Sequence, residues 1–212
     1  MEDQVKKVIE EKNKSSYGIQ DYLSIGYVFL LILGIFHETI YYNFLGINIL
    51  EYSSILDVLI SPVSVISGTL SLGVGFIVCI ILGIAYAKLM PLYYKWLGKK
   101  EKYKSGKKKE KLDKMNMAFK SSSFIIFIIA LYIFGLFIGF GVGRGGKTKE
   151  KLAKETIELT HQLVFEDGEK QEVKMLGKNS LYVFYVTQKE REVAIAPIDG
   201  NIKVIKKLKE KE

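Results

Sequence analysis

The sequence predicts an integral membrane bundle of three transmembrane helices (residues 21–146), followed by a small all-β domain of the SH3-like barrel type. Three observations lead to this fold class. Three long apolar runs hold almost no charge, whereas nearly all charged residues of the 212-residue chain lie outside them. After the third run the spacing of apolar residues changes from a helical period to alternation. The loop between the second and third runs is strongly basic, as cytoplasmic loops beside membrane spans are.

The first span is expected over residues 22–47, after a polar N-terminal tail of mixed charge (residues 1–20). Its charge-free part is short, and His37 and Glu38 follow it directly. A carboxylate near the hydrocarbon is energetically costly and therefore suggests a functional site. We take His37 and Glu38 as a possible intramembrane polar site. Glu38 also lies close to the aromatic residues at 41–44, which favour the membrane surface, where a carboxylate is hydrated.

Residues 48–61 connect the first two spans without any lysine or arginine, and their apolar residues follow roughly a helical period. Such a segment suits the membrane interface or a dip back into the bundle. Pro62 is expected to open the second span (residues 62–90), because proline is tolerated at a helix start. Residues 63–87 form an uncharged run of 25 residues, enough to cross a hydrocarbon core of about 30 Å.

Two stripes of small residues predict close helix packing in the membrane. They recur every four residues on the second span and again on the third span (residues 121–143). Small residues let neighbouring backbones approach closely, which favours packing between these helices or with a second copy of the chain. The predicted packing residues are Ser71, Gly75, Cys79, Gly83, Ala87, Gly135, Gly139 and Gly143.

The lysine-rich loop at residues 99–120 carries ten lysines against three acidic residues, a balance of +7 within a formal net charge of +8. This bias predicts that the N-terminus and the loop face the cytoplasm. Three crossings then place the C-terminal domain outside the cell membrane, taken as a bacterial inner membrane. The basic residues from Arg144 to Lys154 oppose this orientation, and a fourth crossing by residues 48–61 would reverse it.

Anionic lipid is the expected partner of the lysine-rich loop, because a basic run beside a membrane span is attracted to anionic headgroups. A single aromatic residue, Tyr103, interrupts the run. The loop therefore lacks the stacking platform of a nucleic-acid site, and no nucleic acid is expected. The predicted lipid contacts are Lys99, Lys100, Lys107, Lys108 and Lys109.

The C-terminal part, residues 147–212, is predicted to hold a juxtamembrane helix and five short strands, after a flexible joint at Gly145 and Gly146. Five strands in such a short stretch suggest a small barrel. A domain of this size is marginally stable alone, so we expect it to lean on the membrane or on a partner. Tyr182 and Phe184 are possible partner-binding residues if they lie on an open face.

The sequence offers little for catalysis or cofactor binding. Residues 141–146 match the glycine pattern of dinucleotide sites, but they follow a membrane helix instead of a strand. Two histidines and one cysteine are too few for an ordinary zinc site. His37 and Ser71 could form a nucleophile pair, but packing explains Ser71. We therefore expect no enzyme activity, no cofactor and no bound metal.

Two functions from different classes stay open. The first is a non-enzymatic, membrane-anchored binding or scaffold protein whose β domain engages a protein or peptide partner. The second is a pore or transporter component that self-associates through the glycine stripes, with Glu38 lining a polar path. This second class includes membrane-disrupting effectors of bacterial defence, whose general plan of helices and a small β-barrel is similar. We expect a homo-oligomer or a protein partner.

Overall fold

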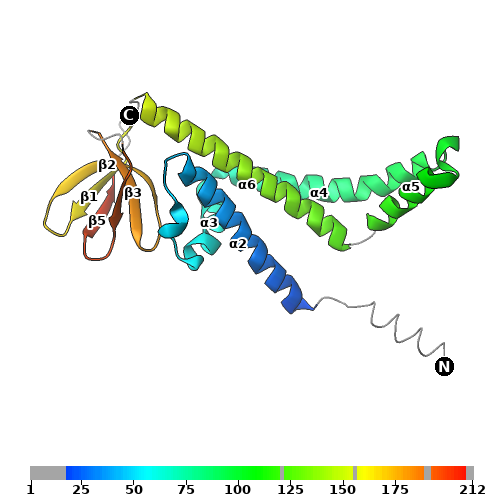
Figure 1. Ribbon diagram of the computed structural model, residues 1–212, viewed down its shortest axis with the longest axis horizontal. Helices are drawn as coiled ribbons and strands as arrows, with labels where there is room; N and C mark the ends of the chain where they lie inside the picture. Colours follow the sequence, from blue (N-terminus) through cyan, green and yellow to red (C-terminus); the bar gives the residue numbers. More distant parts are fainter. Residues whose placement is uncertain (1–17, 120–121, 155–156, 189–191, 209–212) are drawn as a thin grey trace.

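The computed structural model describes residues 18–119, 122–154, 157–188 and 192–208. An elongated group of helices carries a β-sheet at one end (Figure 1). Most of the predicted N-terminal tail lies outside the described residues. Three helices are long and apolar enough to cross a membrane: α2 (Ile19–Asn43), α4 (Leu70–Leu97) and α6 (Ser122–Ala153).

The three long helices pack into a bundle in which α6 contacts both α2 and α4. Leu33 of α2, Leu72 of α4 and Phe137 of α6 are buried together at its centre. The outer faces of all three helices expose large apolar side chains. A contiguous apolar surface of this kind indicates contact with a membrane, as the three uncharged runs predicted.

The connector after α2 is largely helical, as its apolar period indicates, but its main helix extends past residue 61. A short 3₁₀ helix, η1 (Ile49–Glu51), precedes α3 (Ile55–Gly68). Pro62 lies inside α3, so the prediction that it opens the second span is wrong. The break instead falls at Thr69, whose extended backbone (φ −131°, ψ 99°) separates α3 from α4. At its other end α4 continues through Pro91, past the predicted limit at residue 90.

The helix α3 is too short to be a fourth crossing. Its 14 residues span about 21 Å, less than a hydrocarbon core of about 30 Å. On α4, Gly75 faces Leu136 and Gly83 faces Ile129, so α4 runs antiparallel to α6. The start of α4 therefore lies alongside the half of α6 that leads to the sheet. Figure 1 shows α3 beside α2, at the end of the bundle that carries the sheet.

A close backbone contact joins α3 to α2. Because Pro62 has no N–H, the carbonyl of Val58, four residues earlier, lacks its helical partner. A Cβ atom added to Gly34 of α2 would lie only 1.9 Å from that carbonyl oxygen. Gly34 is therefore required at this crossing, since any side chain would push the two helix backbones apart.

We expect Gly34→Ala to lower the free energy of unfolding by about 1–3 kcal/mol, because the two helices must separate to admit the methyl group. Gly26→Ala on the same helix is the matched control, since nothing lies within 4 Å of its Cβ position. The measurement is thermal unfolding of the full chain in detergent. Equal unfolding temperatures for the two variants would contradict the requirement for glycine at position 34.

The lysine-rich segment is largely helical. It forms η2 (Glu101–Tyr103) and α5 (Gly106–Ala118) at the end of the bundle opposite the sheet (Figure 1). The five lysines predicted to contact lipid are exposed there. An exposed basic helix at one end of an apolar bundle is compatible with a position at the membrane surface.

The helix α6 runs without a break through Gly145 and Gly146, so the predicted flexible joint and separate juxtamembrane helix are wrong. A Cβ at Gly145 would lie 2.6 Å from the ring of Phe44, just beyond α2. Gly145 therefore serves close packing between α6 and the end of α2. Its role is steric, and the helix needs no hinge there.

The five predicted strands are present and form one antiparallel sheet in the order β4-β3-β2-β1-β5. Within the described residues β4 and β5 do not pair with each other, so the sheet is not closed into the predicted barrel. One face buries a cluster around Leu163, Val173 and Val183, and the opposite face turns Phe184 toward the bundle. The strands are β1 (His161–Phe165), β2 (Lys170–Lys178), β3 (Tyr182–Thr187), β4 (Ala194–Pro197) and β5 (Ile202–Lys207).

Candidate functional site

Aromatic side chains dock the sheet onto the end of the bundle. The ring of Tyr42 lies 4.9 Å from that of Phe184, and the ring of Tyr52 lies 5.4 Å from that of Tyr182. Phe184 is 0% exposed and Tyr182 is half-buried. The two residues considered for partner binding therefore face the chain's own helices, and the open face required for that role is not found.

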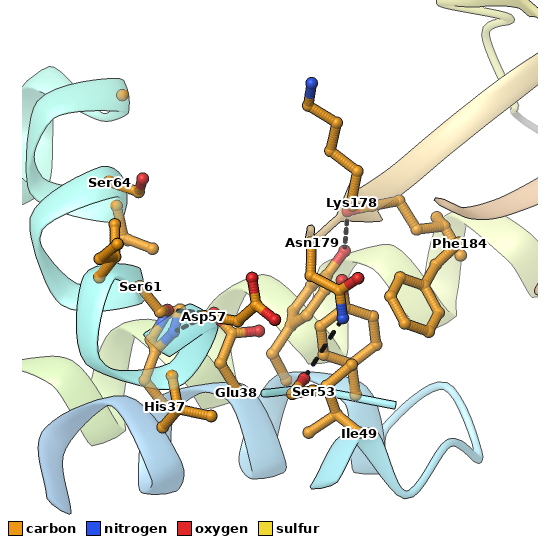
Figure 2. Close-up of a pocket in the computed structure, with 18 of the residues that line it drawn as sticks. His37, Glu38, Ile49, Ser53, Asp57, Ser61, Ser64, Lys178, Asn179 and Phe184 are labelled. Carbon is orange, nitrogen blue, oxygen red and sulfur yellow. Dashed lines mark hydrogen bonds and ion pairs between the residues drawn. The ribbon is translucent and has the colours of Figure 1, made fainter. Parts of the chain in front are cut away.

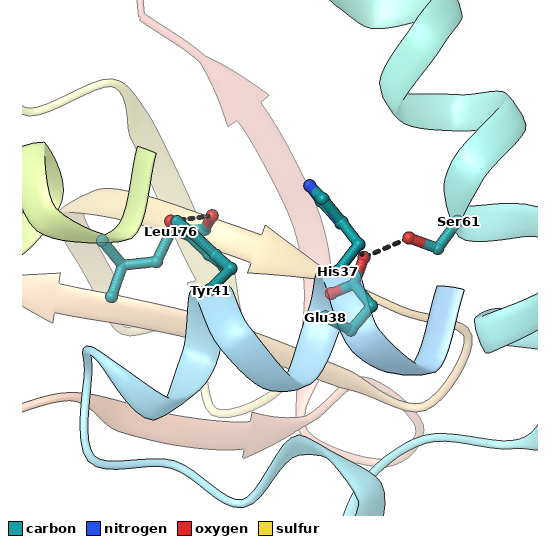
Figure 3. Close-up of polar contacts among 5 residues, drawn as sticks. All are labelled: His37, Glu38, Tyr41, Ser61 and Leu176. Carbon is teal, nitrogen blue, oxygen red and sulfur yellow. Dashed lines mark hydrogen bonds and ion pairs between the residues drawn. The ribbon is translucent and has the colours of Figure 1, made fainter. Parts of the chain in front are cut away.

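A bulge in β2 accepts a hydrogen bond from the end of α2. The register of β2 against β3 shifts between Met175 and Gly177, so Leu176 stands outside the regular ladder. The buried hydroxyl of Tyr41 donates a hydrogen bond of 3.1 Å to the Leu176 carbonyl (Figure 3). A Cβ at Gly177 would lie 2.1 Å from the Tyr42 hydroxyl. The bulge and the glycine thus fit the two tyrosines that end α2.

The turn after β2 is fixed to the start of α3. Asn179 donates a hydrogen bond of 2.8 Å from its side-chain amide to the Tyr52 carbonyl. The backbone N–H and the hydroxyl of Ser180 donate to the two carboxylate oxygens of Asp57, at 3.0 Å and 2.9 Å. Asp57 also accepts from Ser54, which caps the N-terminus of α3. One carboxylate therefore closes a helix cap and an interdomain contact.

These hydrogen bonds affect the protonation of Asp57. Partial burial alone would raise its pKa, but the hydrogen bonds from Ser54 and Ser180 outweigh burial and hold the pKa below its ordinary value of 3.8. A carboxyl group with a lowered folded-state pKa stabilises the fold above its unfolded pKa. That stabilisation is lost as the pH falls through the folded-state value.

We expect the contact between Asp57 and Ser180 to open as the pH falls through the folded-state pKa of Asp57, which lies below 3.8, because protonation removes the acceptor charge. The protection of the amides of residues 180–182 against hydrogen exchange, taken relative to the intrinsic exchange rate at each pH, should then fall in the full chain. Asp57→Ala should show the lower protection already at pH 7, whereas Asp113→Ala in the exposed helix α5 should not. Protection at these amides that is the same above and below that pKa and in Asp57→Ala would contradict the assignment.

A cavity of about 420 Å³ lies between α2, α3 and the β domain; we call it the junction cavity. Figure 2 shows its polar side chains arriving from all three elements. His37 and Glu38 come from α2, Ser61 and Ser64 come from α3, and Asn179 comes from the turn after β2. The structure thus brings the predicted polar pair into one cavity with groups distant in sequence.

His37 is the most unusual residue of the junction cavity. Its side chain is 1% exposed, yet neither ring nitrogen has a hydrogen-bond partner among the described residues. The ring stacks on Phe140 (6.1 Å between centroids) and meets Phe137 edge-on at 5.8 Å. Burying an unpaired polar group costs about 1–3 kcal/mol. A ligand that pairs with the imidazole would recover part of that cost.

Glu38 accepts a hydrogen bond from α3. Its Oε1 atom accepts a hydrogen bond from the hydroxyl of Ser61 (Figure 3) and lies 3.6 Å from Nδ1 of His37, beyond hydrogen-bond distance. Because the Ser61 hydroxyl is directed to the carboxylate, it is not held by the imidazole, as an activated nucleophile would be. His37, Glu38 and Ser61 together therefore offer hydrogen-bond donors and acceptors and do not form a catalytic nucleophile.

The junction cavity offers no set of described side chains that could hold a metal ion. Among the described residues, no group of three or more histidine, cysteine, aspartate or glutamate side chains converges. Arg144 and Lys178 also line the junction cavity and bring positive charge to it. A cavity with both signs of charge and several hydroxyls suits a polar organic ligand better than a metal ion.

The predicted packing residues fall into two groups. Gly75, Cys79 and Gly83 lie on the side of α4 that faces α6, with Gly83 buried against Ile129. The glycine stripe on α6, at positions 135, 139 and 143, is turned outward, because no atom lies within 4 Å of a Cβ built at any of these glycines. Ser71 is exposed and Ala87 is half-buried. The outward glycines are Gly135, Gly139 and Gly143.

Four residues of the junction were not identified from the sequence: Ser61, Asp57, Asn179 and Ser180. For Asp57 a signal existed, because Ser54 and Asp57 have the spacing of a capping box, although that pattern predicts only a helix start. The pairing of α3 with the turn after β2 leaves no trace in local sequence. No protein-family model, curated protein or solved structure is detectably similar to this chain.

Proposed function

We propose that this chain is a membrane-anchored, non-enzymatic binding protein that engages a peptide segment of a partner in the junction cavity. The helices anchor the chain, and the β domain forms one wall of the site. The observation that carries the proposal is His37, a buried imidazole among the lining residues of the cavity, for which the described part of the chain provides no hydrogen-bond partner at either nitrogen. Buried polar groups without a hydrogen-bond partner are rare in natural proteins, and a bound ligand is one explanation for such a group.

The lining of the junction cavity favours a peptide. Its volume of about 420 Å³ lies within the range of ligand cavities, which runs from about 300 to 1,000 Å³. Peptide N–H groups could donate to His37 or to Glu38, and peptide carbonyls could accept from the Ser64 hydroxyl. Ile49 and Val65 supply the apolar wall on which side chains would pack.

We further propose that the β domain lies outside the cytoplasmic membrane. The ten lysines of the lysine-rich segment support a cytoplasmic position for the opposite end of the bundle. The connector between α2 and α3, which has no lysine or arginine, lies at the same end as the β domain. A peptide partner would therefore approach from the extracytoplasmic side.

Photo-crosslinking in the native membrane tests the proposal. We expect p-benzoylphenylalanine placed at Ser64, which lines the junction cavity, to capture a peptide-containing adduct that mass spectrometry identifies. The matched control is the same probe at Val63, the exposed neighbour that does not line the cavity. Adding His37→Phe should remove the adduct without lowering the unfolding temperature, because phenylalanine keeps the ring contacts and has no unpaired nitrogen.

Two outcomes would contradict this proposal. Identical adducts at positions 63 and 64 would mean that the probe reports only the surrounding lipid. An adduct that persists unchanged in His37→Phe would mean that the imidazole takes no part in binding.

A pore or transporter component is the second candidate. One observation favours it: the glycine stripe of α6 is turned outward and could seat a second copy. This candidate predicts ion flux across liposomes that contain the purified chain, and loss of that flux in Glu38→Gln. Liposomes that stay ion-tight with the wild-type chain would exclude it.

A further inference from the structure

A second cavity, of about 530 Å³, lies where α6 leaves the bundle and passes β2; we call it the basic groove. It shares Tyr41, Arg144 and Leu176 with the junction cavity, but its other walls differ. One wall is the side of α6 from Gly139 to Leu152, and the other is β2 at Lys174 and Met175. Nothing in the proposed function uses this groove.

The basic groove carries a marked excess of positive charge. Four cationic side chains line it against a single acidic one, Glu158. No ion pair within 4.0 Å involves any of the four cations in the part of the chain that the structure describes. The guanidinium of Arg144 lies 4.6 Å from the centre of the Tyr41 ring, which orients it. The four cations are Arg144, Lys147, Lys151 and Lys174.

Below these charges the basic groove is apolar and open. Its wall on α6 is formed here by Gly139, Phe140 and Gly143. No atom lies within 4 Å of a Cβ built at either glycine. Gly135, one turn further into the bundle, is equally open. The three glycines thus form a shallow track along the outer side of α6, in the part of the helix that is free of charge.

The position of the basic groove relative to the bilayer follows from the sequence. An uncharged run of 23 residues, 121–143, ends where Arg144 begins. The cations therefore lie at the level of the lipid headgroups, and the glycine track lies at the level of the acyl chains. Arg144, Lys147 and Lys151 are three or four residues apart and so project from one side of α6.

We infer that the basic groove binds one anionic phospholipid, with its phosphate among the four cations and one acyl chain along the glycine track. Arginine suits this role because its guanidinium forms paired hydrogen bonds with phosphate oxygens. The site also accounts for a basic cluster on a side of the membrane where the positive-inside bias would not place one. Its ligand differs from that of the proposed peptide site, and the two sites share only three of their lining residues, Tyr41, Arg144 and Leu176.

Native mass spectrometry of the full chain in neutral detergent tests the inference. Titration with phosphatidylglycerol and with phosphatidylcholine should show one tightly held phosphatidylglycerol and at least about tenfold weaker phosphatidylcholine. The triple variant Lys147→Gln, Lys151→Gln and Lys174→Gln should lose on the order of a hundredfold in affinity for phosphatidylglycerol. The matched control, Lys107→Gln, Lys108→Gln and Lys109→Gln in α5, removes the same charge at the opposite end of the bundle and should leave that affinity unchanged.

A second arm separates a lipid from a free phosphate. Gly139→Leu with Gly143→Leu fills the track and should weaken phosphatidylglycerol at least about tenfold, because the acyl chain loses its place while the cations remain. Inorganic phosphate at millimolar concentration should not displace the lipid. The exposed pair Lys147→Gln and Lys151→Gln provides a milder variant should the triple variant unfold.

Any of four results would overturn the inference. The control triple variant could weaken phosphatidylglycerol as much as the groove variant, or phosphatidylcholine could bind equally well. Inorganic phosphate could compete at the same site, which would make it a simple anion site. Filling the track could change the oligomeric mass and leave the affinity for phosphatidylglycerol intact, which would assign the glycines to a contact between copies of the chain.

Discussion

The contact between the end of α2 and the sheet is the constraint on which the rest of the structure depends. Two consecutive tyrosines serve it in different ways. The ring of Tyr42 packs on Phe184, while the hydroxyl of Tyr41 donates a hydrogen bond to the carbonyl of Leu176, which lies at the bulge in β2. A five-stranded open sheet of this size is only marginally stable on one core alone. The bundle supplies the second core, and the sheet's orientation follows from it.

This docking places the polar groups of the junction cavity at the boundary between the helices and the sheet. A face of the sheet that a free domain would offer to partners is covered by the chain's own helices. The junction cavity encloses polar groups from three elements, and among the described residues the buried His37 ring has no hydrogen-bond partner. Sites formed in this way are common where two domains meet, because neither surface alone can enclose a ligand.

Much of the architecture was predictable from the sequence, because lipid requires long uncharged runs and these are visible without any knowledge of contacts. Glu38 could be singled out for the same reason, since a carboxylate in such a place is costly. The features that could not be predicted are long-range. Pro62 resembles a helix start until the carbonyl it frees is seen against Gly34, and Gly145 resembles a hinge until Phe44 is seen against it. Asp57 has a clear local role, and its interdomain role depends on a turn more than a hundred residues away.

The unbroken course of α6 has a mechanical consequence. Its 32 residues form one rod of about 48 Å that starts next to the lysine-rich segment and ends at the β domain. A rod of this length converts a tilt of about five degrees at one end into a displacement of about 4 Å at the other. A thinner bilayer, which a long span accommodates partly by tilting, would therefore change the spacing between α6 and β2.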